Sequence, residues 1–233
     1  MNVLVTIPAR ANSKGVKNKN LRTINGISLI DWAVDAGHTF GPIVLTSNLP
    51  EFDKWYGRAD ERIYYHSRPV ELCGSTALAW ETWQDAVRAA ERALNRSWEY
   101  HLYLEPSSPC RTKDDLSDAL SALQRGESSY CTVSPAPKPS KLFRLHKNRI
   151  EGLPNNLFHI YNNTPRQALR DSLHYQKNGL VYACTDERMK SATTMLDQET
   201  YIEIVERPVV NIDTEADLIL AEKLLGPSRG PAG

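Results

Sequence analysis

The stretch Asn2–Asn20, NVLVTIPARANSKGVKNKN, decides the fold and marks the first candidate site. Its first part, Asn2–Pro8, is a short run rich in β-branched residues, which is typical of a buried strand. The polar loop that follows carries four cations within ten residues and contains Gly15, which lets backbone amides approach a ligand closely. A solvated basic loop is the alternative interpretation, but its position after a strand favours a phosphate site.

Strands and helices alternate over the residues that follow. We predict strands over Pro42–Thr46, Arg62–Tyr65, Tyr100–Leu104 and Ser129–Val133. We predict helices over Ile27–Gly37, Thr76–Leu94, capped by Ser75 or Thr76, and Lys113–Leu123, with Pro109 and Arg111 at its cap. This alternation indicates an α/β fold with a mainly parallel sheet and helices on both faces.

The alternation stops over residues 134–176, which are rich in Pro, Asn, Lys and Arg and contain a turn at Lys147-Asn148. We interpret them as a hairpin-like inserted arm. Beyond it we predict a strand over Asn178–Cys184, edge or return strands over Tyr201–Val205 and Val209–Ile212, and a helix over Thr214–Leu225 with a capping box formed by Thr214 and Asp217. We therefore expect one domain over residues 1–225 and a flexible tail over 226–233.

Composition excludes several classes of protein. The 233 residues hold 28 Lys plus Arg and 28 Asp plus Glu, a balance that argues against a dedicated nucleic-acid binder. No apolar run approaches the roughly 20 residues of a membrane helix, and the N-terminus does not read as a secretory signal. The four cysteines form no CxxC pair, which favours reduced thiols. We expect a cytoplasmic protein with neither nucleic-acid nor membrane partners.

Three predicted strands end in polar residues, at Pro8-Ala9-Arg10, Thr46-Ser47-Asn48 and Glu105-Pro106-Ser107. Ligands of open α/β sheets bind beyond the carboxyl ends of the strands, so these residues should build the site. Neither the Walker sequence nor the dinucleotide-binding glycine pattern is present.

Five segments, in order, resemble motifs of the CMP-sialic acid synthetases, also called acylneuraminate cytidylyltransferases. They are Ile7–Asn20, Arg68–Leu72 with Ser75–Ala77, Leu104–Arg111, Pro165–Gln167 with Asn178–Tyr182, and Asn211–Leu218. The resemblance runs from Val3 to about Leu225. It implies a Rossmann-like nucleotidyltransferase fold and a homodimer in which the inserted arm completes the partner's active site. It also implies a reaction in which CTP and an acidic acceptor give a CMP conjugate and pyrophosphate, with Mg²⁺ as cofactor.

The resemblance also assigns roles to single residues. The triphosphate would lie against Arg10, Ser13, Lys14, Lys19 and Asn20, of which Lys19, Arg10 and Lys14 would be catalytic. The cytosine would be held by Arg68, Ser75, Thr76 and Ala77. The acceptor would contact Lys141, Arg166, Asn178 and Glu105, and Mg²⁺ would be bound at Asp213.

Two departures from the family pattern concern the metal and the acceptor. Asn211 stands where the family has an aspartate, and Glu105 stands where it has a glutamine. We expect Glu105 to restore the lost charge, so that Glu105, Asp213 and Asn211 hold the metal together. The alternative is that Glu105 is ion-paired to Arg111 or Arg10.

Because the replaced glutamine contacts the sugar in the family, these departures favour a small acceptor, phosphonoformate, as in phosphonate and phosphinate biosynthesis. Two alternatives remain. One is a CMP-sialic acid (nonulosonic acid) synthetase, and the other is a catalytically inactive CTP-binding protein.

Overall fold

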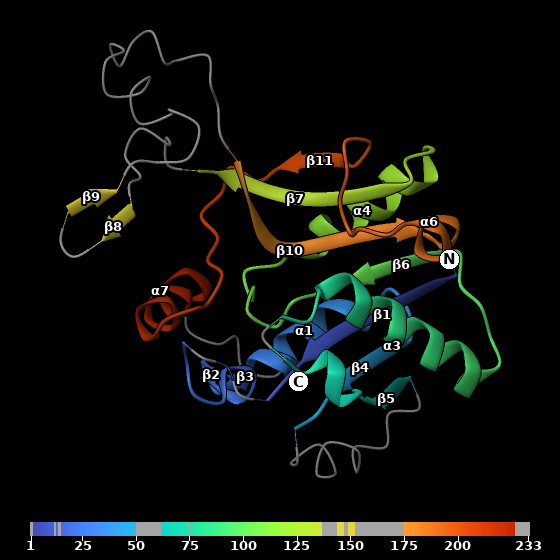
Figure 1. The fold of residues 1–233 in the computed structure, drawn as a ribbon, viewed down its shortest axis with the longest axis horizontal. Helices are drawn as coiled ribbons and strands as arrows, with labels where there is room; N and C mark the ends of the chain where they lie inside the picture. The colour runs from blue at the N-terminus through green and yellow to red at the C-terminus, as the bar shows by residue number, and fades with distance from the viewer. Residues whose placement is uncertain are drawn as a thin grey trace, which may run out of the picture.

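The computed structural model describes residues 2–11, 13, 15–49, 62–74, 76–136, 144–146, 149–151 and 175–226. Its centre is a seven-stranded sheet in the order β11-β7-β10-β6-β1-β4-β5 (Figure 1). These strands are β1 (Val3–Ala9), β4 (Ile43–Ser47), β5 (Ile63–Ser67), β6 (Tyr100–Tyr103), β7 (Ser129–Pro135), β10 (Tyr175–Thr185) and β11 (Tyr201–Ile204). The helices are α1 (Leu29–Gly37), α3 (Ala79–Leu94), α4 (Lys113–Gln124), α6 (Asp186–Ser191) and α7 (Glu215–Leu225).

Short elements complete the chain. The 3₁₀ turns are η1 (Lys19–Leu21) and η2 (Val70–Leu72), and two small antiparallel pairs are β2 (Thr23–Ile24) with β3 (Ile27–Ser28) and β8 (Arg144–His146) with β9 (Arg149–Glu151). The β8–β9 pair lies within the segment interpreted as an arm.

Most of the sheet is parallel, as the alternation of elements predicts: β6, β1, β4 and β5 run the same way, and β7 runs parallel to β11. Strand β10 runs antiparallel to both β6 and β7. It begins at Tyr175, opposite Pro135 at the end of β7, so the chain re-enters the sheet at the end from which it left. The α/β fold is thereby confirmed, with one reversed strand at the insertion.

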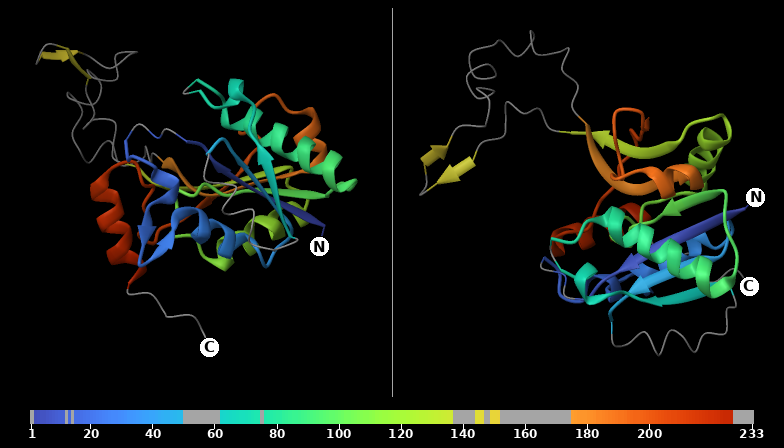
Figure 2. Two further views of the ribbon diagram at one scale, coloured as in Figure 1. Left: turned by 90° about the horizontal axis from the view of Figure 1, so that it is seen from below. Right: turned by 45° about the vertical axis from the view of Figure 1, so that its right-hand side comes forward.

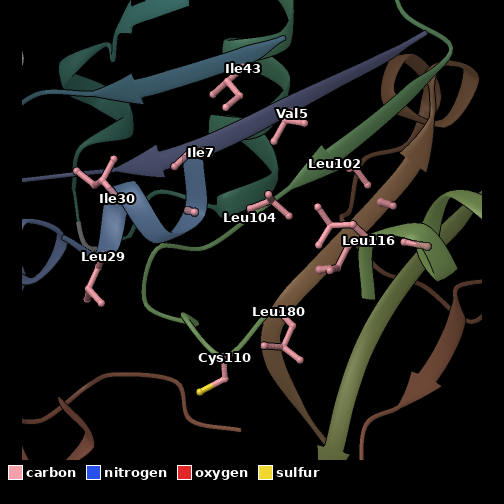
Figure 3. Packing of buried hydrophobic residues seen from close by; sticks show 14 of the residues in the cluster. Val5, Ile7, Leu29, Ile30, Ile43, Leu102, Leu104, Cys110, Leu116 and Leu180 are labelled. Carbon is pink, nitrogen blue, oxygen red and sulfur yellow. The ribbon is translucent and has the colours of Figure 1, made fainter. Parts of the chain in front are cut away.

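Helices cover both faces of the sheet (Figure 2). Strand β1 shows why: its alternate residues Val3, Val5 and Ile7 enter the core that α1 and α4 cover, whereas Leu4 faces the other core, which contains Trp80 and Trp83 of α3. Figure 3 shows the first core, in which Ile7 of β1 lies near Ile30 of α1 and Leu102 of β6 near Leu116 of α4. Burial of these two faces makes β1 a central, rigid strand that can hold a loop in place at its end.

Three local predictions are wrong. Val209–Ile212 is not a strand, because its buried residues Val210 and Ile212 anchor an irregular segment whose Ile212 amide donates to Ser107 O at 2.8 Å. Helix α3 begins at Ala79 and its N-cap is Leu78, which makes no side-chain cap, so Thr76 is not the cap; Ser75 lies outside the described residues. Helix α4 is capped by Thr112 in a capping box with Asp115, not by Arg111 or Pro109.

In the part of the chain that the structure describes, no helix is both long and apolar enough to cross a membrane.

Candidate active site

A cavity of about 420 Å³ lies beyond the carboxyl ends of β1 and β6, where the sequence places the site. Its walls come from four stretches of chain: the end of β1 and the basic loop, the segment from Arg68 to Thr82, the end of β6, and the segment before α7. Of the predicted residues, those on its walls are Arg10, Ser13, Lys19, Asn20, Arg68, Ala77, Glu105, Asn211 and Asp213. Residues up to about 200 positions apart in the chain therefore line a single hollow.

The basic loop is held against this hollow by hydrogen bonds at both ends. Ala11 N donates to the side chain of Asn48 after β4 at 2.8 Å, and Asn20 Nδ2 donates to Arg10 O at 2.9 Å. Gly15 packs directly on the segment before α7, because a Cβ at this position would lie 2.1 Å from Asp213 O. Only glycine fits this contact, so the loop and Asp213 are fixed relative to each other.

Lys19 links the basic loop to Asp213, an acidic residue of the cavity wall. It opens η1, directly after Asn18 in a left-handed conformation (φ 52°). Its ammonium donates to Ile212 O at 2.7 Å and to Asp213 Oδ1 at 3.0 Å. The Lys19 side chain is only 19% exposed, whereas that of Asp213 is 77% exposed. The ammonium is therefore held in place while the carboxylate keeps free oxygen lone pairs toward the cavity.

Arg68 is a buried residue of the wall that the segment from Arg68 to Thr82 forms. Its Nη2 donates to Thr46 O at 2.9 Å, and its backbone amide donates to Ser47 O at 2.8 Å. Burial lowers the pKa of Arg68, although the guanidinium stays protonated. The Arg68 Nε atom is buried and has no hydrogen-bond partner in the described part of the chain. A buried donor without a partner is costly unless a ligand completes it.

Glu105 lies at the end of β6 beside Gly179, Ser108 and Asn211. A Cβ on Gly179 would lie 2.5 Å from Glu105 Oε2 and from Ser108 Oγ, and 3.2 Å from Asn211 Nδ2. Burial raises the pKa of Glu105, and Arg111, Lys177 and Lys19 oppose this rise. Among the described residues the Glu105 carboxylate has no ion pair within 4 Å, so the predicted alternative of a pair with Arg111 or Arg10 is not formed.

Side-chain oxygens that could bind a metal ion line the cavity near Glu105. Glu105, Asp213 and Asn211 all line it, and Asn211 Oδ1 is buried without a hydrogen-bond partner in the described residues. Carboxylate and amide oxygens are the ligands that Mg²⁺ prefers. The described residues contain no group of three or more His, Cys, Asp or Glu that could hold a metal ion, so Glu105 and Asp213 would need further oxygen ligands, of which Asn211 Oδ1 is one candidate.

The motif resemblance implies that Asn178 contacts the acceptor, but the structure gives its side chain other surroundings. Its side chain is buried in the irregular part of β10, where Oδ1 accepts from Thr132 Oγ1 at 2.6 Å and Nδ2 donates to Ser134 Oγ at 3.1 Å. It is not on the cavity wall, and neither is Thr76, which is exposed. Lys14, Ser75, Lys141 and Arg166 lie outside the described residues.

The structure adds wall residues that sequence reasoning missed. Tyr103 and Thr82 line the cavity from β6 and α3. In the sequence Tyr103 belongs to a predicted strand and Thr82 to a predicted helix, and no local signal marks either as a site residue. The sequence offers Arg111 as an ion-pair partner of the Glu105 side chain. In the structure Arg111 contacts only the backbone carbonyl of Glu105, and Gly179 lies against the Glu105 carboxylate.

Comparison with known proteins agrees with this geometry. The family model described as cytidylyltransferase matches residues 4–43, which contain most of β1, the basic loop and Lys19. The post-translational flagellin modification protein B of Campylobacter coli is 24% identical over 96% of this chain and 94% of that protein. The chain is thus similar to cytidylyltransferases, among them N-acylneuraminate cytidylyltransferases. The motif resemblance and the assignment as a nucleotidyltransferase enzyme are thereby confirmed.

One further curated relative and one solved structure extend the comparison. The N-acylneuraminate cytidylyltransferase B of Danio rerio is 22% identical over 93% of this chain, which spans 50% of that protein. A CMP:2-keto-3-deoxy-manno-octonic acid synthetase, solved in complex with CTP, superposes with a TM-score of 0.63 at 12% identity, over 97% of this chain and 98% of that one. The second likeness confirms the nucleotidyltransferase fold. None of the relatives named here is described as acting on phosphonoformate.

Proposed function

We propose that this cytidylyltransferase transfers CMP from CTP to a 2-keto sugar acid of the N-acylneuraminate type and releases pyrophosphate. The observation that carries the proposal is the cavity itself, which brings Arg10 and Lys19 of the loop after β1 together with the acids Glu105 and Asp213. Relatives named for N-acylneuraminate and for 2-keto-3-deoxy-manno-octonic acid support a sugar acid over phosphonoformate, to which the departures at Glu105 and Asn211 point.

In this proposal the basic loop binds the triphosphate. Arg10, Lys19 and Lys14 supply positive charge, while Ser13 and Asn20 supply hydrogen bonds. An acceptor hydroxyl oxygen attacks the α-phosphorus in line, its proton passes to solvent, and the bond from the α-phosphorus to the bridging oxygen of pyrophosphate breaks. Lys19, held between Ile212 O and Asp213, offsets charge on the phosphates as this bond breaks.

In the same proposal, other residues bind the cytosine base and the acceptor. Arg68, whose Nε makes no hydrogen bond within the described part of the chain, would bind the cytosine together with Ser75, Thr76 and Ala77. Lys141 and Arg166 would pair with the acceptor carboxylate, with Glu105 beside the acceptor; Asn178 would act indirectly, by shaping the β10 segment next to Glu105. Asp213, Glu105 and Asn211 would hold Mg²⁺, which when bound supplies charge neutralisation to the phosphate oxygens.

The deciding experiment follows pyrophosphate release from CTP and Mg²⁺ with N-acetylneuraminate, 2-keto-3-deoxy-manno-octonate and phosphonoformate offered separately. We expect release with a sugar acid, absent when the acceptor is omitted or when ATP replaces CTP. Release with phosphonoformate alone would overturn the proposed acceptor and make Glu105 and Asn211 a specificity signature. CTP binding without release from any of the three would favour the inactive binder.

We also propose that the chain acts as a homodimer in which residues 134–176 reach the partner's active site. The test mixes a Lys19→Ala variant with an Arg166→Ala variant. If the arm acts in the partner's site, each mixed dimer contains one site free of both changes, and random mixing restores about a quarter of the wild-type rate. No recovery, with a dimer seen by light scattering, would place the arm in its own subunit's site.

A further inference from the structure

Arg111 is a buried cation without a carboxylate partner among the described residues. Its guanidinium lies between the turn after β6 and strand β10, and it donates to the carbonyl oxygens of Leu180, of Glu105 at 3.0 Å and of Gly179 at 3.2 Å. Burial lowers the pKa of Arg111 to about 10, so it is still protonated at neutral pH. A buried guanidinium is costly unless its geometry is well satisfied, and here three backbone carbonyls satisfy it.

These three carbonyls belong to two segments that meet at the cavity. Glu105 follows β6, whereas Gly179 and Leu180 belong to the part of β10 where the pairing register with β7 shifts. Gly179 has φ +71° and no side chain, which makes room for the Glu105 carboxylate against its Cα. Ser108 Oγ donates to Asn178 O at 2.9 Å and joins the same two segments a second time.

We propose that Arg111 is a positioning residue, which fixes the Glu105 carboxylate at the acidic side of the cavity by tying the turn after β6 to β10. The inference rests on the proposed function, because it assumes that Glu105 takes part in the reaction. Arg111 does not line the cavity and touches Glu105 only at its backbone carbonyl, so it acts through Glu105 and not on the substrates.

The planar, forked guanidinium is what the position requires. It reaches three carbonyls from one plane, whereas the ammonium of a lysine is a single point charge on a flexible stem and cannot satisfy the same set. Arg111→Lys therefore keeps the charge and loosens the junction. A displacement of about 1 Å in a reacting group costs roughly 10²-fold in rate, so loosening should appear mainly in turnover.

The experiment compares Arg111→Lys with Arg207→Lys. Arg207 is a suitable control because it also donates to a backbone carbonyl, Cys110 O at 3.2 Å, in the same region, and it contacts neither Glu105 nor Gly179. We expect Arg111→Lys to lower kcat about 10- to 100-fold and to raise the Mg²⁺ concentration needed for half-maximal rate, with the Kd for CTP without metal within about twofold. Arg207→Lys should change none of these.

A double-mutant cycle with Glu105→Gln separates positioning from general support of the fold. If Arg111 acts through Glu105, Arg111→Lys has little further effect on kcat once Glu105 is replaced. Additive effects in the double variant, or a wild-type rate in Arg111→Lys, would overturn the inference. If the wild type itself releases no pyrophosphate, the proposed function fails, and this outcome is distinct from an active wild type with an equally active Arg111→Lys.

Should Arg111→Lys fail to fold, Ser108→Ala tests the same junction with a smaller change. It removes the hydrogen bond to Asn178 O, and we expect a decrease in kcat and a rise in Mg²⁺ requirement, both smaller than those expected for Arg111→Lys. Unchanged kinetics in a folded Ser108→Ala protein would contradict the inference.

Discussion

Lys19 shows how a single residue takes its role from contacts far away in the chain. Its ammonium is fixed by Ile212 O and Asp213 Oδ1, 193 and 194 positions away. The ion pair is partly buried at the lysine, which limits solvent screening and leaves the ammonium at the cavity wall. Lys17 of the same loop differs in this respect, since it is exposed and does not line the cavity.

Lys19→Ala should therefore lower kcat for pyrophosphate release by about 10²- to 10³-fold, because a fixed positive charge near the phosphates is lost. The matched control is Lys17→Ala, which removes the same charge from the same loop and should retain more than half of the wild-type rate. Steady-state rates at saturating CTP and acceptor provide the measurement. Equal rates for both variants would show that the net charge of the loop, and not the position of Lys19, matters.

At the scale of elements, the start of α7 links stability to the site. Thr214 caps the helix by accepting from Asp217 N, and the Asp217 carboxylate accepts from the amides of Asp213 and Thr214. The capping box that favours the helix thus also fixes the backbone of Asp213, the residue that pairs with Lys19.

Thr214→Ala should cost about 1 kcal/mol of stability, the usual value for losing an N-cap, and should also lower kcat because Asp213 is less well held. The control is Thr185→Ala, which removes the N-cap of α6, where Thr185 Oγ1 accepts from Arg188 N. Thr185 lies away from the cavity wall, so its loss should cost similar stability without a change in kcat. Urea denaturation and steady-state kinetics on both variants test this difference.

At the scale of the whole molecule, the sheet buries a histidine at its centre. His101 lies on β6 between β1 and β10 with a fully buried side chain, its Nε2 is 3.2 Å from Asp186 Oδ1, and its Nδ1 has no partner in the described structure. Burial lowers the pKa of His101 below its ordinary value of 6.5, and the hydrogen bond with Asp186 opposes this shift only in part. The folded protein therefore favours the neutral imidazole more than the unfolded chain does.

The sign of the resulting pH dependence is fixed. Below pH 6.5 the unfolded chain binds a proton at His101 that the folded chain does not bind, so this residue's contribution to stability is complete above pH 6.5 and is lost as pH falls. We expect His101→Gln to be less stable than wild type at pH 7.5 but to lose less stability between pH 7.5 and 5. Urea denaturation at both pH values measures this; His66→Gln, at a partly exposed histidine, is the control.

Much of the fold could be predicted because its signals are local. The β-branched run of β1, the helical periodicity of α1 and the Thr214–Asp217 capping box of α7 depend on neighbours within a few residues. The segment Val209–Ile212 misled the same reasoning, since an apolar run looks alike whether it pairs in a sheet or anchors an irregular loop in the core. The start of α3 misled it as well, because Thr76 has the propensity of an N-cap residue although the helix begins three residues later, at Ala79.

The sequence alone predicts the alternating architecture and the basic loop after β1, because both depend on short-range patterns. It also predicts which strand ends build the site, because the carboxyl ends of parallel strands meet at one edge of the sheet. Tertiary structure alone decided the partners. It pairs Lys19 with Asp213 and buries Asn178 against Thr132, away from the cavity wall. It also leaves Glu105 without an ion pair among the described cations, while Arg111 donates to the Glu105 backbone carbonyl. The contacts of Lys19 with Asp213, of Asn178 with Thr132 and of Arg111 with Gly179 join residues 46 to 194 positions apart. Their geometry depends on how the whole sheet packs, which no local pattern encodes.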